Sequence, residues 1–456
     1  PDGLMKILHD SIPYELHPKI EKWLDDLSSD NGKLYEAYLQ TVNDIEQLEN
    51  YAKELVDSGS PQNLKTASNV GYAVNTIKDT DILSFLSRKS ILPKYGFPVD
   101  SVELFTSPAS YGFRNTSKLR LSRDLAIAIA EYAPDSEIVA DGKLYKSRYI
   151  KLPPRKNHAL IEHSFAICTN PECGCINTAL NRAEIRGHCR ICNSEVEEMG
   201  SYIIPQYGFV SEVRSKNATT KKPDRTYRGD VHYIGNSVGK TDEFTINEVD
   251  ISVTKTKDDE LLIMNRTPFY MCRSCGYAVR KKGGINEISR FSKEQHRTTE
   301  GRPCANKTFD KVYLGHELKT DVAIISISKK FEKNQALSVL YALLEGVSAY
   351  YSIERKDISG CLYYARSGGN LHTVFVLYDT VPGGAGHVSR IASGSADGMK
   401  GVLKEAYKVV ADCTCGGEDG NGACYSCLCN YENQRVHDRL NRGLAKKYLG
   451  EILDEN

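Results

Sequence analysis

The side chains best able to do chemistry in this sequence are its cysteines. Twelve of the fourteen cysteines, together with one histidine, fall into three clusters whose spacing is typical of four-ligand zinc sites. Four thiolates, or three thiolates and an imidazole, close a tetrahedral shell around zinc and leave no open position for water. The pattern therefore predicts three structural zinc ions. By itself it predicts no reaction.

The first cluster contains one more cysteine than a zinc ion needs. Its predicted ligands are Cys168, Cys173, Cys189 and Cys192. Gly174 suits the tight backbone bend after Cys173, and for that reason we favour Cys173 over Cys175 as the fourth ligand. The alternative is a set of buried free cysteines, because cysteine is among the most buried residue types.

The second and third clusters are separated by more than a hundred residues. The predicted ligands of the second are Cys272, Cys275, His296 and Cys304, and those of the third are Cys413, Cys415, Cys424 and Cys427. His296 lies in a basic stretch, so the alternative for it is a surface histidine. Cys361 and Cys429 have no predicted role. Because ligating thiols must be deprotonated, zinc binding should be coupled to the folding of these loops.

Composition places the chain among ordinary globular proteins. Of its 456 residues 40% are hydrophobic and 26% charged, and the formal net charge is zero. The net charge of the chain therefore produces no electrostatic field that attracts nucleic acid or acidic lipid, and any basic patch must be local. The chain has no apolar run near the roughly 20 residues of a membrane span and opens without a charged-then-apolar leader. We expect a cytoplasmic protein without membrane contact, in which cysteines bind metal rather than form disulfides. Because the first residue is Pro1, we also expect a piece of a larger protein.

Hydrophobic periodicity predicts a multidomain α+β protein. Apolar side chains recur at steps of three and four between Leu34 and Leu55, which indicates an amphipathic helix that Gly59 ends. Strands and turns are expected over residues 91–152, including the short apolar run 125–132. Further strands are expected at 245–254, 261–271, 322–328 and 371–378, and helices at 335–353, 399–412 and from about 433 onward. The predicted regions are a helical region (1–90), a small mixed α/β region (91–164), a first zinc ribbon (165–205), a β-rich region with the second zinc site (206–310) and an α/β domain with a zinc knuckle (311–456).

Two glycine-rich segments invite comparison with phosphate-binding loops. The segment from Gly235 to Thr241 is one residue short of a P-loop and is followed by a strand-like pattern rather than a helix, so we reject an ATP site there. Gly383 to Gly386 follows a predicted strand and either nests an anion or simply turns the chain. Asp379 and His387 flank it and could form an acid–base pair, although no nucleophile is evident.

Two groups of cations could contact nucleic acid. Arg435, Arg439, Arg442 and Lys446 step by four, three and four, which on a helix places all of them on one face. Beyond the second zinc pair, a basic loop begins with Arg280, Lys281 and Lys282. Rows of cations of this kind contact phosphates in nucleic-acid-binding proteins. The alternative for both groups is a solvated charged surface.

The C-terminal third resembles a known family. The segment YDTVPGGAG (378–386), a predicted helix, and then Cys413-x-Cys415 and Cys424-x2-Cys427 are similar to the MrfA zinc-binding (MZB) C-terminal domain family. The segments TDV (320–322) and YENQRVH (431–437) fit the same pattern, and LPKYGFP (92–98) and EYAP (131–134) look like segments of larger relatives. Those relatives are superfamily-two DNA helicases of bacterial DNA repair and anti-phage defence, including the DISARM and Druantia systems, and the helicase-partner subunit of DISARM. The resemblance implies that the four cysteines of the third cluster bind zinc. It does not imply ATPase activity here, because the motor motifs are absent from this sequence.

The resulting hypothesis is a zinc-binding, DNA-engaging C-terminal region of a superfamily-two helicase, or its partner subunit. DNA and a helicase motor, in cis or in trans, are the expected partners, and the region performs no chemistry by itself. Two alternatives remain at this point: a metal-dependent nuclease that uses Asp379 and His387, and a protein-interaction scaffold that binds no nucleic acid.

Overall fold

The computed structural model describes most of the chain, which divides into two compact units. The described residues are 32–59, 61–78, 101–106, 121–153, 160–180, 182–212, 215–224, 229–235, 239–280, 296–331, 334–367, 370–392 and 396–455, with a few isolated positions before residue 120. The first unit comprises Pro1–Val99, Ala109–Thr116 and Pro154–Lys156, and the second comprises Asp100–Pro108, Ser117–Pro153 and Asn157–Asn456.

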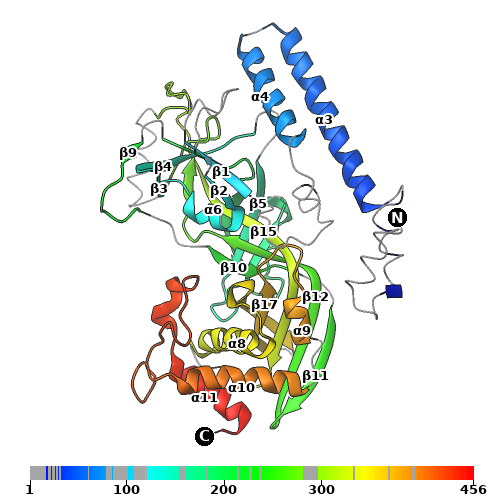
Figure 1. Ribbon diagram of the computed structural model, residues 1–456, viewed down its shortest axis with the longest axis vertical. Helices are drawn as coiled ribbons and strands as arrows, with labels where there is room; N and C mark the ends of the chain where they lie inside the picture. Colours follow the sequence, from blue (N-terminus) through cyan, green and yellow to red (C-terminus); the bar gives the residue numbers. More distant parts are fainter. Residues whose placement is uncertain are drawn as a thin grey trace. The chain divides into compact units, whose positions relative to one another are not determined.

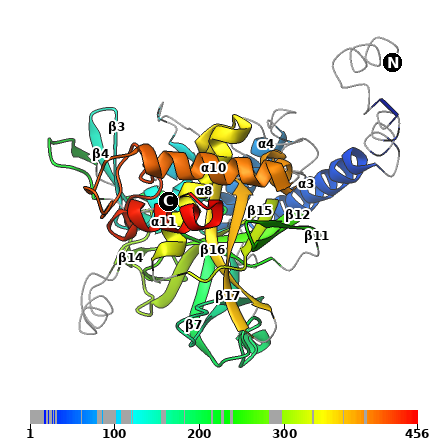
Figure 2. The ribbon, with the colours of Figure 1, turned by 90° about the horizontal axis from the view of Figure 1, so that it is seen from below.

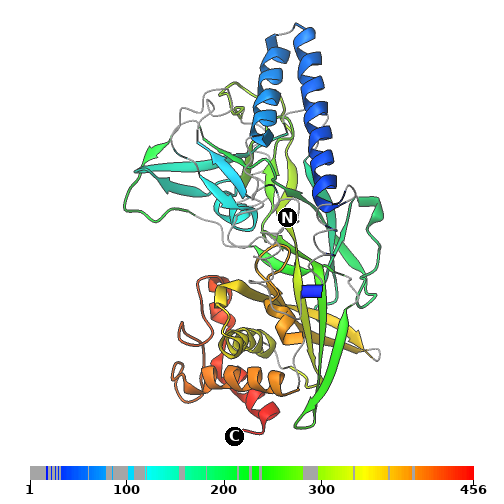
Figure 3. The ribbon, with the colours of Figure 1, turned by 45° about the vertical axis from the view of Figure 1, so that its right-hand side comes forward.

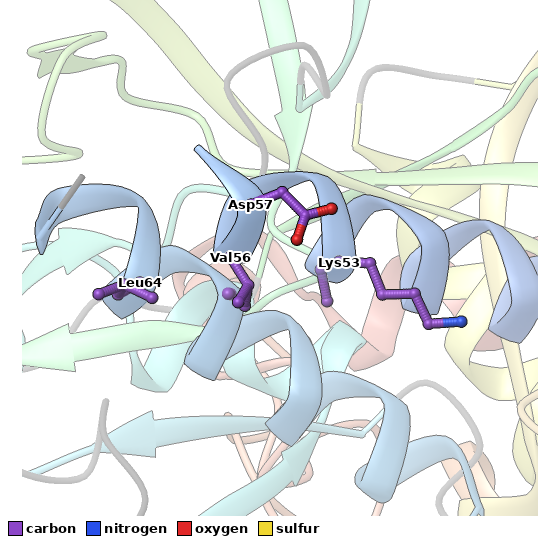
Figure 4. Close-up of a pocket in the computed structure, with 6 residues that line it drawn as sticks. Lys53, Val56, Asp57 and Leu64 are labelled. Atoms are coloured by element: carbon purple, nitrogen blue, oxygen red, sulfur yellow. The ribbon is translucent and has the colours of Figure 1, made fainter. Parts of the chain in front are cut away.

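The described part of the first unit is a helical hairpin. Helices α3 (Lys33–Asp57) and α4 (Pro61–Lys78) pack against each other (Figure 1), and Lys78 Nζ lies 2.8 Å from Glu49 Oε1 across the pair. Gly59 has a φ of +66° just after α3, so the predicted helix and its end are confirmed. An open groove of about 580 Å³ lies on the hairpin, where apolar Val56 and Leu64 adjoin the charged Lys53 and Asp57 (Figure 4).

The second unit contains a six-stranded sheet. Its spatial order is β2 (Ser122–Asp124), β1 (Ser101–Phe105), β8 (Phe209–Ser211), β4 (Lys143–Ile150) and β3 (Glu137–Ala140), and β9 (Lys216–Asn217) pairs with β4. Helix α6 (Leu125–Glu131) contacts β1 and β2. The expectation of strands and turns is wrong at α6, because Asp124 caps this alanine-rich run by accepting a hydrogen bond from Ala126 N at 2.8 Å.

An eleven-stranded sheet makes up much of the remainder. Its main path is β10 (Asp230–Tyr233), β12 (Val249–Met264), β15 (Asp310–Ile327), β7 (Val196–Ile204), β5 (Ile161–Cys168) and β6 (Ile176–Ala179); the strands that pair off this path are β11 (Lys240–Ile246), β13 (Phe269–Met271), β14 (Ala278–Arg280), β16 (Ile358–Ser367) and β17 (Asn370–Asp379). Strand β15 pairs with β7 and β13 near its start, and with β12 and β17 toward its end. This one strand therefore joins the cysteine-rich middle of the chain to its C-terminal part.

The C-terminal part of the chain contributes three helices that lie beside the eleven-stranded sheet. These are α8 (Gln335–Tyr351), α10 (Ala396–Asp412) and α11 (Arg442–Leu453), which pack against one another (Figures 1 and 2). The short helices are α9 (His387–Ala392), η3 (Arg182–Glu184), η4 (Arg355–Asp357) and η5 (Gln434–Arg439). Leu343, Phe375, Val402 and Leu449 are buried in the shared core. Burying each such side chain contributes about 1.5–3 kcal/mol, so the core gives the adjacent cysteine cluster a firm support.

The predicted α+β class is confirmed, with helices at the start, a sheet-rich middle and an α/β C-terminal part. Lys240 begins strand β11 rather than a helix, in agreement with the rejection of a P-loop at Gly235. The division into five regions remains a prediction. None of the helices in the described ranges has the length and hydrophobicity needed to cross a membrane.

Candidate metal centres and nucleic-acid interface

The structure brings the twelve predicted ligands together in three groups of four. Within each group the candidate ligand atoms all lie within 4.8 Å of one another. The pairwise Sγ–Sγ distances are 3.3 Å for Cys168–Cys192, 3.9 Å for Cys173–Cys189 and Cys272–Cys304, 3.6 Å for Cys413–Cys424 and 3.7 Å for Cys415–Cys427. A tetrahedron with Zn–S bonds of about 2.3 Å has edges of about 3.8 Å, whereas a disulfide brings two sulfurs to about 2.05 Å. The distances and donor sets fit zinc, and the predicted cofactor is confirmed.

The first cluster is built from the end of a strand and two tight turns. Cys168 is the last residue of β5, and Gly174 (φ +55°) and Asn193 (φ +61°) supply the left-handed bends after Cys173 and Cys192. Arg190, inside the second turn, donates to the carbonyl oxygens of Tyr233 (3.0 Å) and Ile234 (2.7 Å). This contact attaches the first cluster to β10, and the sequence reasoning missed it because nothing in the local pattern marks Arg190.

The second cluster contains an unpartnered buried nitrogen. His296 Nε2 is buried without a hydrogen-bond partner among the described residues, and the imidazole ring lies against the rings of Tyr277 (4.9 Å) and Phe309 (5.0 Å). Burial lowers the pKa of His296, which favours the neutral form that binds metal. A zinc ion held with three thiolates would satisfy this nitrogen. The residue after Cys275 must be glycine, because a Cβ at Gly276 would lie 2.0 Å from Ile150 O.

The third cluster follows helix α10 directly. Cys413 is the residue after α10, and Ser426 N donates to Cys424 Sγ at 3.3 Å. That N–H lowers the pKa of Cys424 to about 7, whereas burial raises the pKa of Cys415 to about 12 and that of Cys427 to about 11. Crowded thiols do not all ionise unaided. A divalent cation is the partner that would let all four act as thiolates.

The remaining cysteines lie outside these groups. Cys175 is buried and its thiol donates to Ile176 O at 3.3 Å, so the structure places Cys173 rather than Cys175 among the converging sulfurs. Cys429 and Cys361 are also buried. The assignment of individual ligands stays a prediction that metal analysis of variants can test.

In the glycine-rich turn after β17, backbone amides bind a carboxylate of the chain itself. The fully buried Asp379 carboxylate accepts hydrogen bonds from Ala385 N (2.6 Å), His387 N (3.1 Å) and Val388 N (3.0 Å). The amides that could have nested a phosphate are therefore directed at Asp379, and Gly384 is required because a Cβ there would lie 2.5 Å from Asp321 Cγ. This geometry favours a tight turn of the chain over a nest for a phosphate. It also leaves Asp379, the carboxylate of the nuclease alternative, fully buried.

The predicted face of four cations is wrong in its geometry. Residues 434–439 form the 3₁₀ helix η5, and α11 begins only at Arg442, so the four side chains do not share one helix. Arg435 pairs with Asp230 of β10. Arg442 is 4% exposed, and its guanidinium donates to the carbonyl oxygens of Cys415, Val410 and Gly417. Arg442 therefore supports the third cluster and is not available at the surface.

Two members of that group are at the surface. Arg439 and Lys446 are both exposed, and they stay candidates for phosphate contact. In the second group, Arg280 ends β14, and its Nε and Nη2 atoms are buried without a hydrogen-bond partner in the described part of the chain. Lys281 and Lys282 lie outside the described residues.

The match to a protein-family model agrees with the cysteine pattern. Residues 339–428 match the family model of the MrfA Zn-binding domain (MZB). The chain is 22% identical to the Druantia protein DruE of Escherichia coli (strain UMEA 4076-1) over 489 aligned residues, which cover 95% of this chain and 25% of DruE. A similar solved structure, the crystal structure of the DUF1998 helicase MrfA bound to DNA, has a TM-score of 0.37 and 13% identity over 87% of this chain and 43% of that chain.

The chain thus spans a quarter of the length of DruE. All four cysteines of the third cluster fall inside the matched segment. The resemblance to the MZB family is therefore confirmed, and it rests on residues 339–428.

Proposed function

We propose that this chain is the zinc-binding, DNA-engaging region of a superfamily-two helicase, or a partner subunit of such a helicase, in bacterial anti-phage defence or DNA repair. It acts in the cytoplasm, holds DNA for a motor located in cis or in trans, and performs no chemistry itself. The observation that carries the proposal is the similarity to DruE along 95% of the chain, together with an MZB match that contains the third zinc cluster.

The metal centres support a binding role rather than a catalytic one. Each cluster has four protein donors, and a closed shell holds loops rigid without offering a position for substrate or water. Arg190 and Arg442 then connect the first and third clusters to the surrounding fold through backbone carbonyls. Rigid, zinc-supported surfaces suit the recognition of a large partner.

DNA binding can be measured directly on the purified chain. The affinity for a fluorescent DNA should fall as salt rises, with a slope of log K against log salt of about −0.9 for each phosphate contact on a duplex. Charge reversal at Arg439 and Lys446 should weaken binding and flatten that slope. The matched control is Lys404→Glu with Lys408→Glu, which reverses two exposed lysines on α10.

A protein-interaction scaffold predicts a different result. If the chain retains its zinc but shows no salt-dependent affinity for single-stranded or duplex DNA, the DNA part of the proposal is overturned. A DNA-stimulated ATPase rate that rises when the chain is present with its motor would support the helicase part.

A further inference from the structure

A small three-stranded extension of the six-stranded sheet carries lysines that the proposed function does not yet use. Strands β3 and β4 are joined through Asp141 (φ +48°) and Gly142 (φ +67°), the pair of positive φ angles that a type I′ hairpin turn requires. Strand β9 adds to β4, with Lys143 opposite Asn217. We call residues 137–147 and 215–224 the wing; in Figure 3 its strands, β3 and β4 in teal and β9 in green, project to the left.

The chain after β9 remains attached to the hairpin at two points. Ala218 N donates to Gly142 O at 2.9 Å, and farther along Glu137 N donates to Asp224 O at 2.7 Å. Lys221 and Lys222 lie between these anchors. An extended chain advances at most about 3.5 Å per residue, so both lysines stay within roughly 11 Å of an anchor along the backbone. The wing therefore gathers its lysines on one compact projection.

Lysines outnumber carboxylates on the wing by five to three. Lys143, Lys216, Lys221 and Lys222 are exposed, and none forms an ion pair with another described residue. Lys146, nearer the base, pairs with Asp135 at 3.1 Å. The wing's carboxylates are Glu137, Asp141 and Asp224, and Glu137 already accepts a hydrogen bond from Asp224 N. The wing is thus a local positive patch on a chain of zero net charge.

The lysines point from both faces of the ribbon. Residues paired across two strands share a face, and successive residues alternate between faces. Lys143 pairs with Asn217, and Lys216 pairs with Leu144, so Lys143 and Lys216 lie on opposite faces. A flat anionic surface, such as a membrane, can meet only one of these faces. The major groove of duplex DNA is about 12 Å wide and admits a two-stranded β-ribbon such as the β3–β4 hairpin, and phosphates line both of its walls.

The base of the wing is rigid. Arg148 donates to Asp135 Oδ1 (2.8 Å) and through two nitrogens to Glu212 Oε1 (2.9 and 2.6 Å). Asp135 Oδ2 also accepts from Arg280 N at 2.8 Å, and the Arg148 guanidinium lies 5.4 Å from the ring centre of Tyr277. Tyr277 follows the Cys272–Cys275 turn, so the wing is attached to the second zinc cluster. A rigid support keeps the lysines in position for a partner.

We propose that the wing binds duplex DNA by entering a groove, with Lys143 and Lys216 contacting the phosphates of its two walls and Lys221 and Lys222 adding contacts beside them. This inference rests on the proposed function and adds a duplex-binding element separate from Arg439 and Lys446.

The test replaces the four lysines by glutamine in the full chain: Lys143→Gln, Lys216→Gln, Lys221→Gln and Lys222→Gln. Binding to a fluorescent duplex is measured by anisotropy across a salt series. Loss of four contacts should flatten the slope of log K against log salt by about 3 to 4, at about 0.9 per contact. A matched control neutralises four exposed lysines elsewhere: Lys257→Gln, Lys330→Gln, Lys404→Gln and Lys408→Gln. Unchanged zinc content establishes that each variant is folded.

The outcomes separate this inference from the proposed function. If the wild-type chain binds duplex with a salt-dependent affinity that the wing variant retains, the wing inference is wrong and the proposed function stands. If the wild-type chain binds no DNA, both fail. An equal loss on single-stranded DNA would overturn the groove geometry, and a loss confined to anionic vesicles or polyglutamate would assign the wing to another partner. Restoration of the slope by arginine at all four positions would support phosphate contact.

Discussion

The buried guanidinium of Arg442 provides the sharpest test of how the third zinc cluster is supported. Arg442→Met keeps an unbranched apolar side chain and removes all the hydrogen-bond donors. Three carbonyl oxygens would lose their partner: Val410 O near the end of α10 (2.9 Å), and Cys415 O and Gly417 O in the knuckle (both 3.0 Å). The first of these belongs to the last turn of α10, where a cation also stabilises the helix dipole.

The size of the effect follows from these three bonds. A hydrogen bond from a charged group contributes about 1.5–3 kcal/mol, so losing three at the low end costs about 4–5 kcal/mol. Domains are stable by about 5–15 kcal/mol, and the loss should therefore unfold the knuckle under mild conditions. The control Arg439→Met changes an exposed side chain and should alter stability by no more than about 0.5 kcal/mol.

The assay is zinc release during urea unfolding, followed with a coloured chelator. In Arg442→Met one of the three zinc ions should be released at lower urea than in the wild-type chain, while the other two are unaffected. If instead all zinc is retained as in the wild-type chain and only DNA affinity falls, Arg442 contacts phosphate and the reasoning from its hydrogen bonds is refuted.

Three further predictions concern the metal, acid stability and the glycine turn. Elemental analysis should show that Cys424→Ser has lost one of three zinc ions and that Cys429→Ser has lost none. Loss of zinc from Cys429→Ser would change the ligand assignment. Burial lowers the pKa of His232 to about 4, so its neutral form contributes full stability above pH ~6.5. As the pH falls from ~6.5 toward 4, the free energy of unfolding should decrease by at most about 3 kcal/mol, because the unfolded chain binds the proton more readily. Urea unfolding across this range should show the decrease, and His232→Gln should abolish it. Asp379→Asn should lower the free energy of unfolding by about 2–4 kcal/mol, because three backbone N–H groups lose a charged acceptor. The wild-type chain should not cleave DNA with added Mg²⁺, and cleavage that this variant abolishes would restore the nuclease alternative.

The errors of prediction have a common cause. At residues 125–131 a short apolar run did not distinguish a strand from a helix, and the choice depended on the cap at Asp124. Steps of three and four placed Arg435 to Lys446 on one helical face, but the chain breaks between η5 and α11. Regular spacing predicts a shared face only where the helix is continuous.

Spacing in the sequence also does not predict which of these side chains are exposed. Arg435 and Arg442 are as cationic as Arg439, yet one pairs with Asp230 and the other is enclosed by carbonyl oxygens. Asp379 is more than fifty residues from its hydrogen-bonding neighbour Thr320, and its burial depends on the packing of β15 against β17. Such partners are distant in the sequence, so no local pattern reveals them.

The sequence by itself determined the metal chemistry, because each knuckle is a local turn whose cysteines and glycines lie a few residues apart. It also determined the α+β class and the resemblance of the C-terminal part to the MZB family. Only the tertiary structure decided which cations remain at the surface, where the wing projects, and that the glycine turn encloses its own carboxylate. These features depend on contacts between residues far apart in the chain, and such contacts form only when the sheet and helices pack.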